Sequence, residues 1–444
     1  MAAEPAARPF EVTHRGVLAI AVPMTLAYLT TPLVGVVSLG VIGQLGDPAQ
    51  VGGVSIGGLI FDIVFMTFSF LRSGTTGLVA QSLGAGDRRE IAATLARAAL
   101  VAVVIGLAIL ALQAPLIAVA QTLIGGSNAV QAATRAYWQI RVFSAPLAFL
   151  NYVILGWLIG LGRAGYGLAL QIVLNGVNIV LSILLVHGLG WGVAGVGTAS
   201  LVAEGATVVG GIVVVWWLHD QAARPSLAEA MNRAAFVRLF AINRDIMIRT
   251  FALLFAFAFF TARCAKAGDV ILAANEILMN LVALAAYFLD GIAAAAEQLA
   301  GRAIGARHRL AFTRSVRLTV GWGYAIGALV SLGFWLVGPA IIDLMTTSDA
   351  IRATARTYLW LAALFPVVGT LAYQMDGVFI GATWSADMRN MMFVALGAYL
   401  LVWWPLEWAF GITGVWLALL VFLIVRGATL VWRSRVRIGP AFQE

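Results

Sequence analysis

Long apolar stretches alternate with short polar connections along the whole chain. An α-helix needs about 20 predominantly apolar residues to cross the core of a bilayer. Several stretches exceed this minimum, so we expect tilted or protruding helices. The predicted spans lie near residues 16–43, 53–76, 91–121, 129–161, 165–187, 192–218, 235–262, 270–299, 311–340, 350–382, 388–410 and 412–432. The pattern predicts an all-α polytopic membrane protein with roughly twelve transmembrane helices.

The composition agrees with a bilayer as the solvent. Hydrophobic residues make up 61% of the 444 positions and charged residues 11%, against roughly 45–50% and about 25% in soluble domains. Cys264 is the single cysteine, so the chain has no internal disulfide and no thiolate metal cluster. The histidines stand isolated, at His14, His187, His219 and His308, and not at ligand spacing. We therefore expect no enzyme activity, no cofactor and no bound metal.

The net charge of +8 comes almost wholly from arginine, since Lys266 is the only lysine. The arginines fall between apolar spans, where they orient a chain among membrane lipids, so we expect no nucleic-acid partner. With a cytoplasmic N-terminus, one side collects Arg88, Arg89, Arg163, Arg224, Arg233, Arg302, Arg307, Arg309, Arg389, Arg433, Arg435 and Arg437. The other side holds Arg135, Arg263, Lys266, Arg352 and Arg356. This bias predicts that both termini are cytoplasmic. Snorkelling is the expected role of three arginines at predicted cytoplasmic helix ends, Arg72, Arg244 and Arg249.

The longest polar connection divides the chain near its middle. On this basis we predict five parts: a cytoplasmic segment at 1–14, an N-terminal six-helix bundle at 15–218, a cytoplasmic linker at 219–234, a C-terminal six-helix bundle at 235–434 and a cytoplasmic tail at 435–444.

The two halves repeat each other at one constant offset in the sequence. Within VAQSLGAGDRR at 79–89 and LAGRAIGARHR at 299–309, an offset of 221 residues pairs Gly84 with Gly305. At the same offset GWLIGLGRA at 156–164 aligns with GVFIGATWS at 377–385, which pairs Gly156 with Gly377. An even number of spans per half makes the repeats parallel, and transporters with such repeats bind substrate near the midplane where the repeats meet. The repetition therefore favours a transporter that works by alternating access.

Four segments resemble one transporter family. FLRSGTTGLVAQSLGAGD at 70–87 resembles the end of the second helix and the following loop of the multidrug and toxic compound extrusion (MATE) family. NRDIMIRT at 243–250, YFLDGIAAAAEQLAGRAIGA at 287–306 and MDGVFIGATWSADMRN at 375–390 resemble its DNA-damage-inducible F (DinF-like) branch. The similarity covers both halves of the chain.

The resemblance implies a V-shaped pair of six-helix bundles in a bacterial inner (plasma) membrane. Such a protein is an efflux antiporter and a monomer, and exports amphipathic or cationic small molecules, drug-like or lipid-like, in exchange for protons or sodium ions. A flippase for lipids or lipid-linked precursors, from the same superfamily, is the alternative. Such flippases usually carry extra helices and a more cationic central cavity.

Ser38 is where the chain departs from the family. In the DinF-like branch, aspartate normally occupies the positions of Ser38 and Ser182, while Asn178 and Ser200 match the family. The resemblance thus implies a polar cluster of these four residues. A hydroxyl cannot exchange a proton near neutral pH or neutralise the charge of sodium. The four residues either bridge packed helices or retain a weak ion or substrate contact, and without coupling the chain is an uncoupled facilitator.

Ionisable groups inside the spans are the coupling candidates, because their burial in a membrane is unfavourable unless they have a function. Asp376 ranks first, since it matches the acid of the tenth helix that other branches of the family use for cation coupling. Asp290 and Glu297 occupy positions that are commonly acidic in the family. Alternatively, Asp376 is a buried acid tied to Tyr373, to an arginine or to a backbone donor, and Glu297 pairs with Arg302.

The remaining acids in the spans are weaker candidates. Asp62, Glu204 and Glu276 also fit roles in packing or along an access path. Pro23 and Pro32 interrupt the first span and remove backbone donors, so we expect its helix to bend. The bend is either static or changes during transport as a gate.

Overall fold

The computed structural model describes residues 10–218 and 225–442, whose regular structure is helical throughout. The elements are α1 (His14–Gly43), α2 (Pro48–Thr67), α3 (Phe70–Ala85), α4 (Arg88–Ala111), α5 (Gln113–Ile124), α6 (Asn128–Arg141), η1 (Val142–Ser144), α7 (Ala145–Gly160), α8 (Ala164–Ile183), η2 (Leu184–Gly188), α9 (Gly192–Leu218), α10 (Leu227–Ala230), α11 (Arg233–Lys266), α12 (Asp269–Gly305), α13 (Arg309–Met345), α14 (Asp349–Gly381), α15 (Ser385–Phe410) and α16 (Ile412–Phe442). Twelve segments of the described helices are long and apolar enough to cross a membrane. This finding confirms the predicted number of spans.

Polar residues in the connections start the helices. At α2, the Asp47 carboxylate accepts hydrogen bonds from the Ala49 backbone N–H (2.9 Å) and the Gln50 side chain (3.0 Å), and Pro48 occupies the first turn. Both features are typical of helix N-termini, where backbone donors lack intrahelical partners. The hydrogen bonds, that of Gln50 first, hold the pKa of Asp47 below its ordinary value. The cap therefore stays charged at neutral pH.

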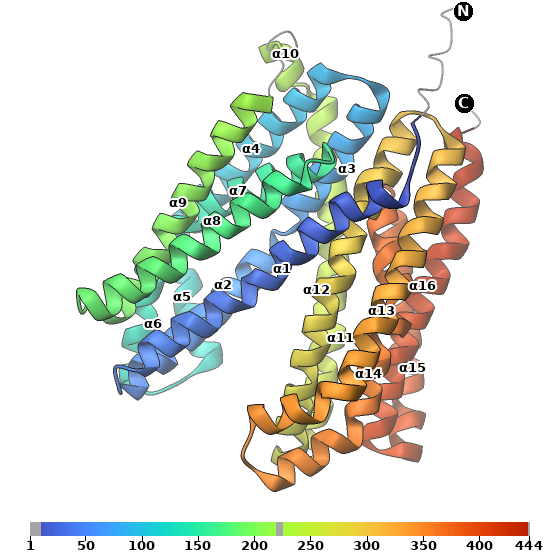
Figure 1. Cartoon of the computed structure of the whole chain (residues 1–444). Coiled ribbons are helices and arrows are strands. Elements are labelled where there is room, and N and C mark those ends of the chain that lie inside the picture. The colour runs from blue at the N-terminus through green and yellow to red at the C-terminus, as the bar shows by residue number, and fades with distance from the viewer. Residues whose placement is uncertain (1–9, 219–224, 443–444) are drawn as a thin grey trace, which may run out of the picture. The chain divides into compact units, whose positions relative to one another are not determined.

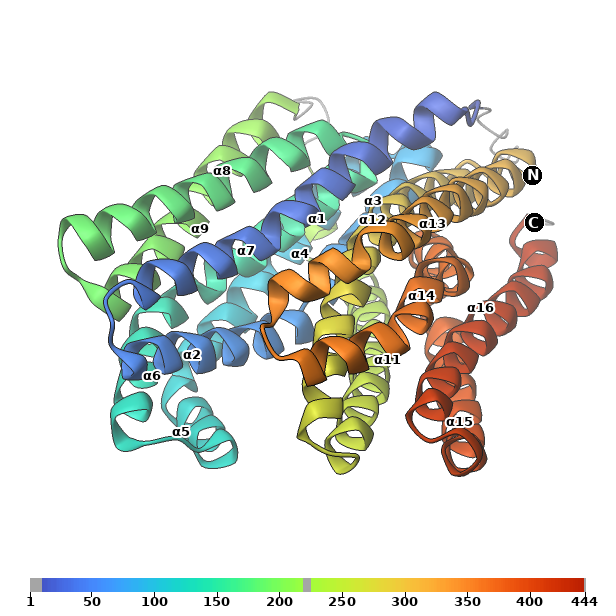
Figure 2. The ribbon, with the colours of Figure 1, turned by 60° about the horizontal axis from the view of Figure 1, so that its bottom comes forward.

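One compact unit, here called the C-terminal unit, comprises residues 10–25, 80–86 and 240–442. Within it α12, α13, α14 and α16 pack side by side, as Figures 1 and 2 show. Its core is apolar and aromatic: the buried rings of Phe260 and Trp416 lie 4.8 Å apart, and the Trp416 indole donates to Asn275 Oδ1 at 2.6 Å. Because lipid is as apolar as these side chains, close packing and internal hydrogen bonds hold such helices together.

Small residues let α12 and α14 approach closely. A Cβ atom added at Gly377 would lie 2.5 Å from the Ala293 carbonyl oxygen, and one added at Gly381 would lie 2.9 Å from the Gly301 backbone nitrogen. Side chains larger than glycine do not fit at either position without moving a backbone. This contact fixes the relative position of the two helices that carry Asp290, Glu297 and Asp376.

The other compact unit, here called the N-terminal unit, comprises residues 26–79, 87–218 and 225–239. In it α8 packs on α9, α4 on α7, and α2 and α9 on α6. Gly156 and Gly160 of α7 face the carbonyl oxygens of Arg72 and Thr76 on α3, the latter at 2.9 Å from an added Cβ.

These glycine contacts recur in both halves of the sequence repeat. The alignment pairs Gly156 and Gly160 with Gly377 and Gly381, which face the carbonyl oxygens of Ala293 and Glu297. At the same offset, Ala293 and Glu297 are the counterparts of the α3 residues whose carbonyl oxygens face Gly156 and Gly160. The alignment of the repeats thus corresponds to equivalent helix contacts within each unit.

The boundary between the compact units passes through α1, between Thr25 and Leu26, and assigns the end of α3 to the C-terminal unit. A Cβ added at Gly291 would lie 2.8 Å from Thr25 Cα, and one added at Gly84 would lie 2.8 Å from the Ala306 nitrogen. The division of the sequence into two six-helix bundles stays a prediction. The predicted segment 1–14, linker 219–234 and tail 435–444 lie partly outside the described residues.

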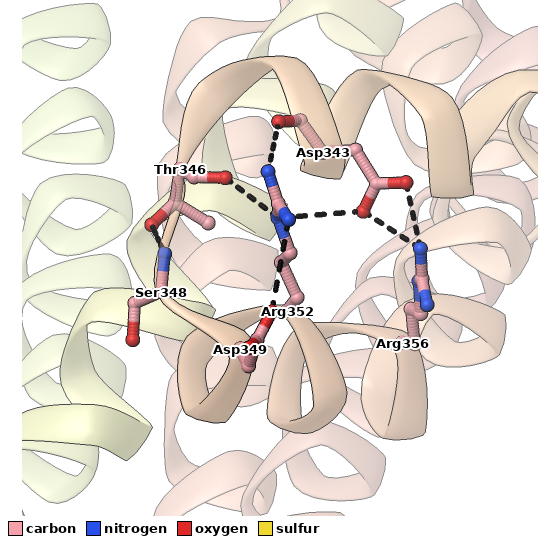
Figure 3. A network of polar contacts seen from close by, with 6 residues as sticks. All are labelled: Asp343, Thr346, Ser348, Asp349, Arg352 and Arg356. Atoms are coloured by element: carbon pink, nitrogen blue, oxygen red, sulfur yellow. Dashed lines mark hydrogen bonds and ion pairs between the residues drawn. The ribbon is translucent and has the colours of Figure 1, made fainter.

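Two arginines tie together the connection between α13 and α14 (Figure 3). Arg356 Nη2 donates to both carboxylate oxygens of Asp343 at 2.7 Å. Arg352 Nε donates to the Thr346 carbonyl at 2.7 Å, and its guanidinium lies 3.6 Å from the Asp343 carboxylate and 3.7 Å from that of Asp349. The Asp343 side chain is 41% exposed, and exposed ion pairs contribute at most about 1 kcal/mol. Asp343 is therefore an exposed acid with which the ion pairs of the buried acids can be compared.

Candidate functional site

Asp376 lies in the interior of the C-terminal unit between two arginines. It projects from α14 and is 4% exposed, and its Oδ2 atom forms ion pairs with Arg249 of α11 and Arg426 of α16. Arg426 is 1% exposed, and its guanidinium lies 5.7 Å from the centre of the Tyr373 ring, where a cation–π interaction stabilises it. The structure agrees with the alternative in which Asp376 is a buried acid tied to an arginine.

The ion pairs do not use all the hydrogen-bonding atoms of Asp376, Arg249 and Arg426. Among the described residues, the buried atoms Asp376 Oδ1, Arg249 Nε, and Arg426 Nε and Nη1 have no hydrogen-bond partner. Buried charges of this kind are favourable only when the opposite charge stays in place. Asp376 therefore acts as the anchor of both arginines.

Asp290 and Glu297 belong to α12, the helix that packs closely on α14. They are seven residues apart, which is about two helical turns and puts them on one face. Arg249 interacts electrostatically with both acids, and Asp290 also interacts with Tyr373. Glu297 is 3% exposed, whereas Asp290 is exposed. We call this group, comprising Arg249, Asp290, Glu297, Tyr373, Asp376 and Arg426, the Asp376 cluster.

The contacts of two arginines in this region differ from the snorkelling role predicted for Arg249 and from the alternative pairing of Arg302 with Glu297. Arg249 does not extend towards the helix end, because its side chain is 15% exposed and pairs with Asp376. The Arg302 guanidinium lies 4.2 Å from the centre of the Phe10 ring, in a cation–π contact in place of the expected pair with Glu297. The sequence did hold a signal for the missed residues, since Arg249 and Arg426 both lie inside apolar spans, where an arginine requires a partner.

Three of the four residues of the predicted polar cluster are joined by hydrogen bonds in the N-terminal unit. Asn178 donates to Ser200 Oγ at 3.0 Å, and Ser182 donates to Asn178 Oδ1 at 3.3 Å, with all three side chains buried. Ser38 is also buried, at 8% exposed, but within the described part of the chain no hydrogen bond joins it to these three side chains. The geometry agrees with residues that bridge packed helices.

The helix of Ser38 is linked to α8 at another place. Asn175 of α8 donates to Thr30 Oγ1 of α1 at 2.6 Å. α1 continues as a helix from His14 to Gly43 through both Pro23 and Pro32. The bend at these prolines, and its role as a gate, stay predictions.

The weaker candidates separate into two groups. Asp62 of α2 and Glu204 of α9 both interact electrostatically with Arg141 of α6. Glu276 is exposed near the start of α12, where its backbone carbonyl accepts a hydrogen bond from Asn280 at 2.9 Å. Asp62 and Glu204 thus share a cluster, which the sequence did not indicate.

Comparisons with known proteins agree with this architecture. The MatE family model matches residues 23–184 and 246–408. DNA damage-inducible protein F of Escherichia coli is 39% identical over 426 residues, which cover 95% of this chain and 93% of that protein. A probable multidrug resistance protein NorM of Caulobacter vibrioides is 28% identical over 451 residues, covering 94% of this chain and 92% of that protein.

Solved structures share the fold. A MOP superfamily transporter from Pyrococcus furiosus superposes with a TM-score of 0.87 at 17% identity and covers 96% of both chains. An outward-facing multidrug resistance MATE family transporter of the MOP superfamily superposes with a TM-score of 0.85 at 18% identity and covers 97% of both chains. The fold is thus that of MATE transporters, which are not enzymes, and twelve helices of membrane-spanning length support an integral membrane protein. The family match over most of the sequence and the identity to the DinF protein lead to one conclusion: this chain belongs to the MatE family of multidrug and toxic compound extrusion transporters.

Proposed function

We propose that this protein is a secondary-active exporter of amphipathic or cationic small molecules, and that the ion that drives export binds at the Asp376 cluster. The ion is a proton or sodium, because either can neutralise a carboxylate. The protein lies in a bacterial inner membrane, where it acts as a monomer.

The interaction of three acids with one guanidinium carries this proposal, by an ion pair for Asp376 and electrostatically for the other two. Asp290, Glu297 and Asp376 were each selected as coupling candidates from the sequence, and all three interact with Arg249. A cation that neutralises one acid weakens the hold of that acid on Arg249. Ion binding can therefore alter the balance between two conformations, which coupling requires.

Within the cluster the roles differ. Asp376 is buried and already paired with two arginines, so it holds Arg249 and Arg426 in position. Asp290 is the one acid of the three whose side chain is exposed. We assign ion exchange to Asp290, with Glu297 as the second acid that competes for Arg249. This assignment revises the ranking from sequence, in which Asp376 came first.

Export itself is tested by the accumulation of ethidium in a bacterial host that lacks its own efflux pumps. We expect cells that express this protein to accumulate less ethidium than cells with the empty vector, because an exporter of amphipathic cations lowers the internal concentration. Equal accumulation with protein present in the membrane, together with movement of a fluorescent phospholipid across reconstituted vesicles, would instead support the flippase.

The orientation is tested with reporters fused after Glu444 and within the connection between α13 and α14. Because arginines are concentrated on one side of the predicted spans, we expect the C-terminal reporter to be active only in the cytoplasm and the α13–α14 reporter only in the periplasm. The reverse pair of results would contradict the proposed orientation.

A further inference from the structure

The N-terminal unit contains a second group of ionisable side chains, away from the serine positions. Glu204 of α9 accepts a hydrogen bond on Oε2 from Asn151 Nδ2 of α7 at 2.6 Å, and the same nitrogen donates to the Glu204 carbonyl at 3.1 Å. Arg141 and Tyr152 interact electrostatically with Glu204, and Asp62 interacts with both Arg141 and Tyr152. We call these five residues the Glu204 cluster.

Arg141 interacts electrostatically with the two acids, but its direct contacts are with Tyr137 and Phe61. Its Nη1 atom donates to the Tyr137 hydroxyl, and its guanidinium lies 4.9 Å from the centre of the Phe61 ring. Among the described residues, no ion pair joins Arg141 to Glu204 or Asp62. Asp376 is different, because it is held directly by two arginines. The charge of Glu204 can therefore change without breaking an existing ion pair.

The buried polar groups around Glu204 are incompletely satisfied. Asn151 is 7% exposed, and its Oδ1 atom is buried with no hydrogen-bond partner among the described residues. Arg141 Nε is likewise buried with no hydrogen-bond partner among the described residues. Unpaired polar atoms are unfavourable in a membrane interior and are usually retained for function. Here they belong to the two residues that interact with the Glu204 carboxylate.

The internal repeat relates this cluster to the Asp376 cluster. Tyr152 and Tyr373 are counterparts at the offset that aligns the two halves, as Gly156 and Gly377 are. Tyr152 interacts with Glu204, Asp62 and Arg141, as Tyr373 interacts with Asp290 and Arg249. Each unit thus has a tyrosine at the same repeat position among acids and an arginine.

We propose that Glu204 is a proton-binding site of the N-terminal unit, with Arg141 as its internal counter-charge, in a chain whose Ser38 and Ser182 cannot bind a proton. This proposal rests on the proposed function as an ion-coupled exporter. A proton from water binds a Glu204 carboxylate oxygen, and the neutral acid leaves Arg141 with Tyr137 and Phe61. When the proton returns to water, the carboxylate attracts Arg141, so protonation changes which contacts Arg141 makes.

The surroundings of Glu204 are mixed in charge. α9 packs against α2, α6, α7 and α8. From these helices, the titratable and charged side chains that interact with Glu204, or with its neighbours Arg141 and Tyr152, are Asp62, Tyr137, Arg141 and Tyr152. Arg72 of α3 also interacts with Tyr152, and α8 carries Tyr166 in its first turn as its one titratable side chain. Arg141 is thus the cation that acts directly on Glu204.

The test is infrared difference spectroscopy of the purified full-length protein in lipid nanodiscs, titrated between mildly acidic and mildly alkaline pH. A protonated carboxyl group has a C=O stretching band that disappears on ionisation. We expect part of the pH-dependent band to be lost in Glu204→Gln and retained in the matched control Glu276→Gln, which replaces an exposed acid outside the cluster. Identical difference spectra for the wild-type protein and a folded Glu204→Gln variant would overturn the proposal.

Arg141→Met provides a second variant that does not depend on the folding of Glu204→Gln. Removal of the counter-charge makes the ionised carboxylate less favourable, so the midpoint of the band should move to higher pH by about one unit or more. An unchanged midpoint would refute the role of Arg141. The spectra do not depend on export, so a titrating Glu204 in a protein that does not export ethidium would contradict the proposed function and leave this site intact.

Discussion

Replacement of Asp376 by asparagine is expected to lower the free energy of unfolding by about 3–5 kcal/mol, because it leaves buried arginines without their counter-charge. Arg426 is 1% exposed and Arg249 is largely buried, and both pair with the same carboxylate oxygen. We also expect Asp376→Asn to abolish ion-driven export, since the anchor of Arg249 is lost. Thermal unfolding of the detergent-purified protein measures the first effect.

Asp343→Asn is the matched control for this experiment. Asp343 also pairs with two arginines, but its side chain is 41% exposed (Figure 3). We expect a loss of at most about 1 kcal/mol there, as for other exposed ion pairs. The double variant Asp376→Asn with Arg426→Met should recover part of the stability, because one uncompensated charge is removed. Equal losses in Asp376→Asn and Asp343→Asn would show that burial of the pair does not matter.

Replacement of Asp290 by asparagine is expected to abolish the dependence of export on the ion gradient with little loss of stability. Asp290 is exposed, so its neutralisation leaves the buried pairs of Asp376 intact. An asparagine keeps the size of the side chain but cannot change charge when a proton or sodium ion arrives. Ion-dependent ethidium transport in everted membrane vesicles measures the effect.

Ser38→Ala is the comparison for Asp290→Asn. Because no hydrogen bond among the described residues joins Ser38 to the Asn178 group, and because a hydroxyl cannot exchange a proton near neutral pH, its removal should reduce transport only modestly. A variant Ser38→Ala without transport, beside an Asp290→Asn variant with normal ion dependence, would return the coupling site to the N-terminal unit.

The spans were predictable because hydrophobicity is a local property of the chain. The prediction of one span at 53–76 nevertheless missed the break between α2 and α3, and the span at 91–121 proved to be two helices, α4 and α5. In each case the apolar pattern continues across the break, so hydropathy alone does not mark it. Leu112 separates α4 from α5 and is itself apolar.

The candidate site was predictable only in part. The resemblance to a family identified Asp290, Glu297 and Asp376, and in the structure all three interact with Arg249. The arginines that pair with Asp376 lie on α11 and α16. Their contacts depend on how these helices pack and rotate, which the local sequence does not specify. The same reason explains why Arg141 and Asn151 were missed beside Glu204.

The most direct test of coupling in the C-terminal unit is the entry of protons and of sodium ions into proteoliposomes during export. The purified protein is reconstituted with ethidium on one side, and a pH-sensitive or a sodium-sensitive dye on the other side reports ion flux. The account predicts that one of the two ions enters with ethidium export by the wild-type protein and by Ser38→Ala, and that this flux is lost in Asp290→Asn. Ion entry that persists in Asp290→Asn and disappears in Ser38→Ala, or export with no ion flux in the wild-type protein, would contradict it.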